Sequence, residues 1–219
     1  MRPDAIAIVL LVCSGCSLMA PKDPAKADFD FGPPAARPSH ASQSFAPDVV
    51  VYEITAPAWM DSSSMYYRLA YQNAANPMPY AQSEWVMSPA ALLTQRLRVR
   101  LSESTVAEVR RVSVDDPPAY ALRSELFEFE QVFDQPDRSR GVLRLRATLQ
   151  GPGVWAQRTF VIEKSAPTAD AAGGVAALSQ CADELASSVS EWIALDQPRT
   201  QEATRSAMPS EQLRPVGMH

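Results

Sequence analysis

Two neighbouring stretches of alternating apolar and polar residues constrain the fold of this chain more than any other feature. They are residues 142–150 and 154–163, separated by the turn sequence Gly151-Pro152-Gly153. In the first stretch, apolar and polar residues alternate. The apolar residues are Leu143, Leu145, Ala147 and Leu149, and the polar ones between them are Arg144, Arg146 and Thr148. A period of two residues is typical of a β-strand with one buried face. The sequence therefore predicts an antiparallel hairpin with one face in water.

Four further segments carry strand patterns. They are rich in β-branched or aromatic residues and cover 48–55, 64–71, 108–114 and 120–133. In the last of them, simple alternation places Phe127, Phe129 and Phe133 on one face together with Glu125. Residues 72–82 contain Asn76-Pro77 and Pro79, and are predicted to form a turn or loop.

Two segments have the spacing of amphipathic helices. Ser88 and Pro89 supply an N-cap and a first helical residue, and an apolar stripe follows at Ala90, Leu93, Leu97 and Leu101. The other side of this helix is expected to carry Arg96, Arg98, Arg100 and Glu103. A longer helix follows Gly173-Gly174, with a stripe at Val175, Leu178, Ala182, Leu185, Val189 and Trp192. The sum predicts an α+β two-layer domain, with two main helices on one face of a mostly antiparallel sheet.

The N-terminus has the layout of an export signal. Arg2 precedes the run AIAIVLLV, which is far shorter than the roughly 20 residues that span a bilayer. Small Ser14 and Gly15 before Cys16 resemble a bacterial lipobox, so cleavage before Cys16 and attachment of acyl chains (palmitate among them) are expected. Ser17 favours the outer membrane over the inner one without excluding the latter. The alternative is an ordinary secreted protein with a free cysteine near its start.

The expected organisation has four parts. Residues 1–15 are a signal peptide, 16–47 the lipidated cysteine and a flexible linker, 48–195 the folded domain, and 196–219 a disordered tail. Within the linker, Phe29-Asp30-Phe31 could form a short edge strand. Cys181 is the only cysteine after Cys16, so no disulfide is expected within the domain. A buried, inert thiol on the second helix is the preferred interpretation of Cys181.

The residues that carry most enzymatic chemistry are missing from the predicted core. The two histidines are His40, in the linker, and His219, at the end of the chain. Asp115-Asp116 is interpreted as a solvated strand end, and there is no glycine-rich phosphate loop. The formal net charge is −5 and no basic patch stands out. We therefore expect no enzyme, metal, cofactor or nucleic-acid partner.

An aromatic group near the first helix is the one candidate site. It comprises Tyr66, Tyr67, Tyr71, Tyr80 and Trp85, interleaved with methionines. One interpretation is a core cap that closes an end of the sheet. The other is an exposed patch that binds a partner or lipid. The partner-binding residues on the second interpretation are Tyr66, Tyr67, Tyr80 and Trp85.

The order of these features resembles the ABC-type transport auxiliary lipoprotein family (PqiC-like, formerly DUF330). The most specific match is in 56–101, where residues 80–93 (YAQSEWVMSPAALL) fit a Y-x-x-x-x-W-x-x-x-P-x-x-x-L pattern. Phe29-Asp30-Phe31, the paired aromatics Tyr66-Tyr67 and the late Trp192 extend the resemblance to about 29–195. The chain departs from the pattern in a longer insertion at 72–78 and in the tail after Leu195.

The resemblance implies a non-catalytic periplasmic lipoprotein. It would work beside an ABC ATPase, a permease and an MCE-domain substrate-binding protein that move phospholipids or other hydrophobic molecules between the two membranes. An alternative is an envelope lipoprotein that binds and regulates a cell-wall synthase. A third is direct carriage of a lipid, which requires a cavity large enough for an acyl chain. A homo-oligomer is left open.

Overall fold

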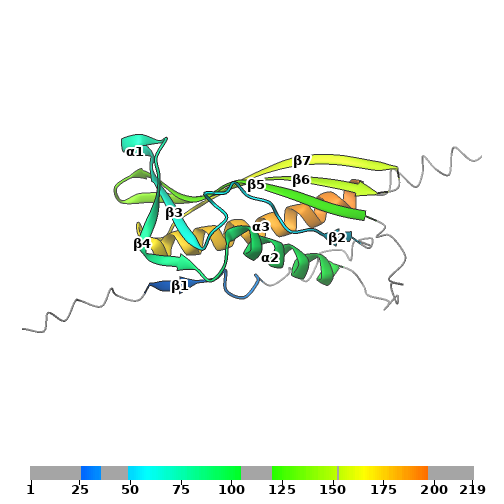
Figure 1. Cartoon of the computed structure of the whole chain (residues 1–219), viewed down its shortest axis with the longest axis horizontal. Helices are drawn as coiled ribbons and strands as arrows, with labels where there is room; N and C mark the ends of the chain where they lie inside the picture. Colours follow the sequence, from blue (N-terminus) through cyan, green and yellow to red (C-terminus); the bar gives the residue numbers. More distant parts are fainter. Residues whose placement is uncertain (1–25, 36–48, 105–119, 152, 197–219) are drawn as a thin grey trace, which may run out of the picture.

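A seven-stranded sheet and two long helices make up the described part of the chain. The computed structural model describes residues 26–35, 49–104, 120–151 and 153–196 (Figure 1). The elements in chain order are β1 (Ala27–Phe29), β2 (Val49–Val51), β3 (Ser64–Leu69), α1 (Ala70–Asn73), β4 (Pro77–Trp85), α2 (Pro89–Ser104), β5 (Tyr120–Gln135), β6 (Arg138–Gly151), β7 (Val154–Ser165) and α3 (Ala171–Asp196). No described helix is long and apolar enough to cross a membrane.

The sheet is mixed, with the strand order β1-β4-β3-β5-β6-β7, and β2 also pairs with β5. Its larger part is the antiparallel meander β5-β6-β7. Parallel pairs join β1 to β4, β2 to β5 and β3 to β5. The helices α2 and α3 lie on the same side of the sheet in Figure 1, so the predicted α+β two-layer class is confirmed.

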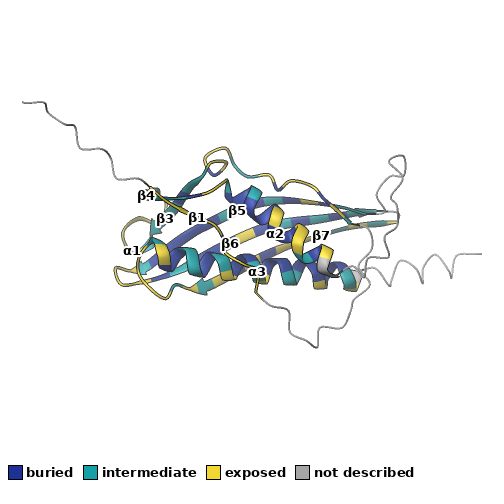
Figure 2. Ribbon diagram, turned by 90° about the horizontal axis from the view of Figure 1, so that it is seen from below, coloured by how far each residue is buried: buried dark blue, intermediate teal, exposed yellow. Residues whose placement is uncertain are grey.

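The hairpin that the alternating pattern predicts is β6-β7. Leu143, Leu145, Ala147 and Leu149 are all fully buried. They face α3, whereas the intervening residues of β6 are partly or wholly exposed from Arg144 to Gln150. In Figure 2, dark blue marks the buried residues along the strands and along the helices that cover them. The hydrophobic effect thus places this face inward, as its period of two residues requires.

Both predicted helices are present, and capping contacts fix where each begins. The amide of Leu92 donates to the Ser88 carbonyl (3.0 Å), and the amide of Ala91 donates to Ser88 Oγ (3.4 Å). The second helix begins earlier than predicted, at Ala171, because the Asp170 carboxylate accepts from the Gly173 amide (2.8 Å). This backbone hydrogen bond lowers the pKa of Asp170. The predicted stripes are buried except at Val175, which is partly buried.

A β-bulge corrects the prediction for the phenylalanines of β5. The pairing with β6 shifts between Leu126 and Glu128, so the side-chain alternation changes phase there. Phe129 and Phe133 are buried, but Phe127 lies on the opposite face with Glu125. The prediction that all three phenylalanines share one face is therefore wrong.

Two further expectations change in the structure, and a third falls on residues that it does not describe. Residues 77–82 are strand, not loop, because Pro77 and Pro79 lie beyond the short pairing with β1, where β4 is a free edge that needs no donor on that side. The first predicted strand shortens to β2, although Thr55 makes an isolated bridge to Glu125. The predicted strand at 108–114 lies outside the described residues.

Part of the predicted linker belongs to the sheet and the core. An edge strand does form, but it lies at Ala27–Phe29 and overlaps the suggested Phe29-Asp30-Phe31 only at Phe29. This strand, β1, pairs with β4, and Phe31 is buried against Trp85 and Phe129. The expected linker over 16–47 therefore contains a segment that packs into the domain. Cys181 is fully buried on α3, as predicted.

Candidate docking surface

Trp85 is the most deeply placed residue of the predicted aromatic group. It is 1% exposed, and its ring lies 5.5 Å from that of Phe31 and 5.6 Å from that of Phe129. A side chain enclosed in this way has no surface to offer a partner. The structure therefore corrects its place among the partner-binding residues and assigns it to the core.

Tyr67 and Tyr80 form a half-buried cap on the helix side of the sheet. Their rings are 4.6 Å apart, and the Tyr80 hydroxyl donates to Gln131 Oε1 at 2.8 Å. Burial raises the pKa of Tyr80, and electrostatic interaction with Tyr67 and Asp170 raises it further. The phenol thus remains protonated and keeps its donor role. This pair fits the core-cap interpretation better than that of an open patch.

Tyr66 and its neighbours remain accessible. The Tyr66 hydroxyl donates to the Trp59 carbonyl (2.9 Å), and the two rings meet edge-on at 5.1 Å. Trp59 and Tyr71 are each 42% exposed. These residues belong to the loop before β3, to β3 and to α1, and they keep an aromatic surface open at this end of the sheet.

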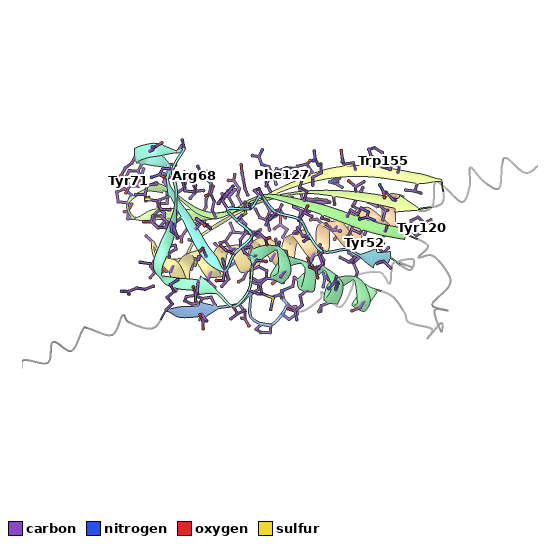
Figure 3. The ribbon with its side chains drawn as sticks, viewed as in Figure 1. Tyr52, Arg68, Tyr71, Tyr120, Phe127 and Trp155 are labelled. Carbon is purple, nitrogen blue, oxygen red and sulfur yellow. The ribbon has the colours of Figure 1, made fainter. Side chains whose placement is uncertain are left out.

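A second aromatic surface was missed by sequence analysis. We call it the outer face: the side of β5, β6 and β7 that the helices do not cover. It carries Phe127 and Trp155 (Figure 3), and the register of β7 places Val161 on it as well. Trp155 is 69% exposed. The signal was present in the sequence, because alternation in 154–163 places Trp155 and Val161 opposite to the buried Phe160 and Ile162.

Paired charges surround these apolar side chains. These charges form ion pairs. Arg146 pairs with Glu125, Arg144 Nε lies 3.4 Å from Glu128 Oε2, and Arg140 Nε lies 3.1 Å from Glu163 Oε2. Each pair is partly exposed to solvent, so each contributes little to stability. Arg146 also lies over the Phe127 ring, 5.0 Å from its centroid. The outer face is thus charge-balanced, with arginine and aromatic side chains that are enriched at protein interfaces.

A partly buried ion pair lies where this face approaches β3. Arg68 Nε donates to Glu130 Oε1 (2.8 Å), and Nη2 donates to Oε2 (3.1 Å). Burial raises the pKa of Glu130, and its hydrogen bond and attraction to Arg68 only partly offset this. The pair joins β3 to β5 across a parallel contact.

A hollow of about 290 Å³ opens on the outer face near β2. Its lining is mostly polar: Tyr52, Glu53, Thr55, Arg123, Ser124, Glu125, Arg146, Thr148 and Gln157. The Arg123 guanidinium lies over the Tyr52 ring at 4.0 Å. A polar lining of this kind suits a peptide or polar group rather than an acyl chain. This hollow therefore gives no support to direct lipid carriage.

Metal-binding groups and reactive thiols among the described residues bear on the question of catalysis. Among residues 26–35, 49–104, 120–151 and 153–196, no group of three or more His, Cys, Asp or Glu could hold a metal ion. Burial raises the pKa of Cys181 to about 12, so its thiol is inert at neutral pH. Cys16, His40, His219 and Asp115-Asp116 lie outside the described residues.

Comparison with known proteins identifies the family. The model of the family described as ABC-type transport auxiliary lipoprotein component matches residues 29–190, which is most of the chain. No curated protein matches the sequence.

Solved structures share the fold. A crystal structure of a Xanthomonas campestris protein of the DUF330 family has 18% sequence identity and a TM-score of 0.66, covering 80% of this chain and 99% of its own. A crystal structure of an uncharacterized protein has 14% identity and a TM-score of 0.60, covering 77% and 99%. At these identities the likeness supports the fold alone.

Proposed function

Because this chain belongs to the family of ABC-type transport auxiliary lipoprotein components, we propose that it is a non-catalytic docking component of an ABC/MCE-type transport system. The system would move phospholipids or other hydrophobic molecules between the inner and outer membranes. The family match over residues 29–190 is the observation that carries this role. The partner would be the MCE-domain protein or the permease, and ATP hydrolysis in the transporter would supply the energy.

The membrane attachment in this proposal is lipidation of Cys16. Acyl chains on that residue would hold the domain at the outer membrane, facing the periplasm. Each buried CH₂ contributes about 0.8 kcal/mol, so more than one chain gives stable anchoring. A tethered domain meets a periplasmic partner at high effective concentration without a large interface of its own.

The outer face is our preferred docking surface, and the exposed surface at Tyr66 and Trp59 is the second candidate. Trp155, Val161 and Phe127 supply apolar area, and the surrounding arginines supply directional donors. Exposed aromatic residues ringed by polar ones are typical of contact hot spots. The paired Glu and Arg side chains would favour a partner with its own mixed charges over a uniformly charged one.

Mild crosslinking and affinity purification of the membrane-anchored protein test the proposal. We expect an MCE-domain protein or its permease to be recovered. Trp155→Ala should reduce this recovery, whereas Leu195→Ala, at an equally exposed position on α3, should not. Recovery of cell-wall synthases instead would contradict the transport role and favour the alternative of an envelope regulator.

The two surfaces can be separated by variants. If the partner binds the outer face, Trp155→Ala should weaken capture and Tyr66→Ala should leave it intact. If it binds at β3, the order should reverse. Loss of capture with both variants would indicate one continuous interface that reaches from β3 to β7.

A further inference from the structure

The chain joins its domain soon after the proposed lipidation site. β1 begins at Ala27 and pairs in parallel with Ser83–Trp85 of β4. The amide of Val86 also donates to the Phe29 carbonyl at 2.9 Å. Phe31 then inserts into the core, where its ring lies 5.7 Å from that of Phe129. Backbone pairing and aromatic packing thus fix this segment at two separate points.

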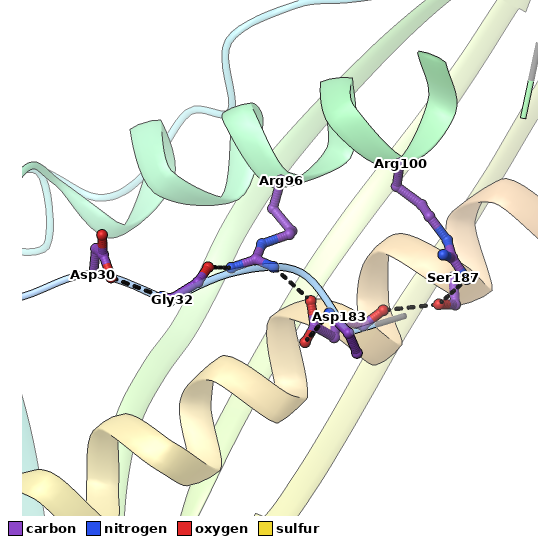
Figure 4. A network of polar contacts seen from close by, with 7 residues as sticks. Asp30, Gly32, Arg96, Arg100, Asp183 and Ser187 are labelled. Atoms are coloured by element: carbon purple, nitrogen blue, oxygen red, sulfur yellow. Dashed lines mark hydrogen bonds and ion pairs between the residues drawn. The ribbon is translucent and has the colours of Figure 1, made fainter. Parts of the chain in front are cut away.

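A polar clamp fixes the same segment at a third point (Figure 4). Arg96 on α2 donates from Nη2 to the Gly32 carbonyl (2.7 Å) and from Nη1 to Asp183 Oδ1 on α3 (2.9 Å). The amide of Ala35 donates to the other oxygen of Asp183 (3.3 Å). Charge-assisted hydrogen bonds of this kind are stronger than neutral ones. The segment is therefore part of the domain up to Ala35.

We infer that only the chain from Cys16 to Ala27 acts as the tether, and that the β1 end of the domain faces the membrane holding the anchor. This rests on the proposed lipidation of Cys16. About 11 peptide units span at most about 40 Å when fully extended. A linker running to residue 47 would instead reach about 110 Å. The fixed segment thus shortens the reach of the domain almost threefold.

The elongated shape of the domain determines which end a short tether holds near the membrane. Figure 1 shows β1 at the same end as α1 and the β5-β6 turn, with the β6-β7 turn at the opposite end. The 14 residues of β6 give a length of about 45 Å between these ends. Tyr71, on α1 at the β1 end, is exposed (Figure 3). Tyrosine is a residue that membrane interfaces favour.

Energy transfer to labelled lipid measures the orientation. The full-length lipidated protein is placed in vesicles of phosphatidylethanolamine and phosphatidylglycerol with acceptor dye on the headgroups. Donor dye is attached at Asp137→Cys, in the β5-β6 turn, or at Trp155→Cys, near the β6-β7 turn. Cys181 is buried and will not compete for the dye. We expect more efficient transfer from position 137; equal or reversed efficiencies would overturn the orientation.

Paired insertions measure the tether. Six Gly/Ser residues between 20 and 21 should increase the distance from position 137 to the membrane by up to about 20 Å. The same six residues between 42 and 43 should leave that distance unchanged, because they follow the fixed segment. If both insertions lower the transfer efficiency equally, the segment releases from the domain and the short tether is wrong.

The anchor itself is checked separately by the mass of the N-terminal peptide. Acyl chains on Cys16 together with equal insertion effects would overturn the tether and leave the proposed function standing. An unmodified Cys16 would overturn both the anchor and the tether that depends on it.

Discussion

Trp85 is held by ring contacts on two sides, and its neighbours come from different parts of the chain. Phe31 meets it nearly edge-on from the segment after β1, and Phe129 meets it from β5. Aromatic pairs of this geometry are each worth roughly 0.5–1.5 kcal/mol beyond the area they bury. Tyr66 has no comparable enclosure, because its ring contacts Trp59 at a partly open site.

Substitution by alanine should affect the stability of the fold far more at Trp85 than at Tyr66. Trp85→Ala should lower the free energy of unfolding by about 3–5 kcal/mol, as expected for a large core side chain. Tyr66→Ala should cost less, about 1–2 kcal/mol, because its hydrogen bond and its ring contact are both at a partly open site. Urea denaturation measures both. A loss below 1 kcal/mol for Trp85→Ala would contradict its place in the core.

Cys181 should make the stability of the protein fall in alkaline solution. Burial raises the pKa of Cys181 from 9.0 to about 12. The folded state therefore holds this proton more tightly than the unfolded chain, so the free energy of unfolding decreases as the pH rises from about 9 towards 12. Between pH 8 and 10.5, Cys181→Ala should lose about 2 kcal/mol less stability than the unaltered protein. Urea denaturation at both pH values measures these losses. If the variant and the unaltered protein lose the same stability, the pKa of Cys181 is not raised.

At the scale of elements, α2 and α3 meet through polar contacts as well as apolar ones. Arg96 reaches from α2 to Asp183, and Arg100 reaches from the same helix to Ser187 Oγ (3.0 Å). The Ser187 hydroxyl in turn donates to the Asp183 carbonyl (2.9 Å). Because the Arg96 side chain is almost fully buried, removing it leaves polar groups without their partner.

Arg96→Ala should loosen β1 without unfolding the sheet. We expect a loss of about 1.5–3 kcal/mol and faster hydrogen exchange at the amides that join β1 to β4. Arg98→Ala on the same helix is the matched control, because its guanidinium contacts the Val51 carbonyl at β2 instead. If both variants speed exchange at β1 equally, the clamp does not fix this segment.

Elements with a regular period were predictable, and those that depend on distant partners were not. The stripes of α2 and α3 and the alternation of β6 follow directly from local sequence. The bulge near Phe127 breaks that local rule, and β4 tolerates Pro77 and Pro79 only because one side of it is a free edge. Arg96 was assigned to the polar side of its helix. Its burial follows from Gly32 and Asp183, which are far away in sequence.

The docking surface shows the same limit. The aromatic group at 66–85 was found by composition, which cannot distinguish the enclosed Trp85 from the open Tyr66. The outer face could have been predicted from alternation in β7, since Trp155 and Val161 share a parity. A dense cluster of aromatic residues stands out by composition, whereas Trp155 and Val161 are separated in sequence and are recognised only by their shared face.

At the scale of the whole molecule, the domain begins earlier than the composition of the chain indicates. Alanine, proline and serine dominate the region before residue 48, yet β1 and Phe31 complete the sheet and the core. A chain that starts at residue 48 therefore lacks one edge strand and one core ring. It also lacks the carbonyl that Arg96 binds.

Truncated chains test this boundary. A chain of residues 26–196 should be more stable than one of residues 48–196 by at least about 3 kcal/mol, the cost of losing a buried phenylalanine. Thermal unfolding followed by circular dichroism measures the difference. Equal melting temperatures would show that β1 and Phe31 are dispensable for the fold.

The central place of β5 has a consequence for how the chain folds. β5 pairs with β2, β3 and β6, and the Arg68–Glu130 contact between β3 and β5 joins residues 62 apart in the sequence. Non-local pairing of this kind slows folding, because the chain loses the entropy of closing a long loop before the stabilising contacts form. A chain that is synthesised from its N-terminus must leave the β5 side of β3 unpaired until residue 133 has emerged. During that interval we expect the incomplete chain to depend on a holding chaperone more than a chain of this length with local strand pairing would.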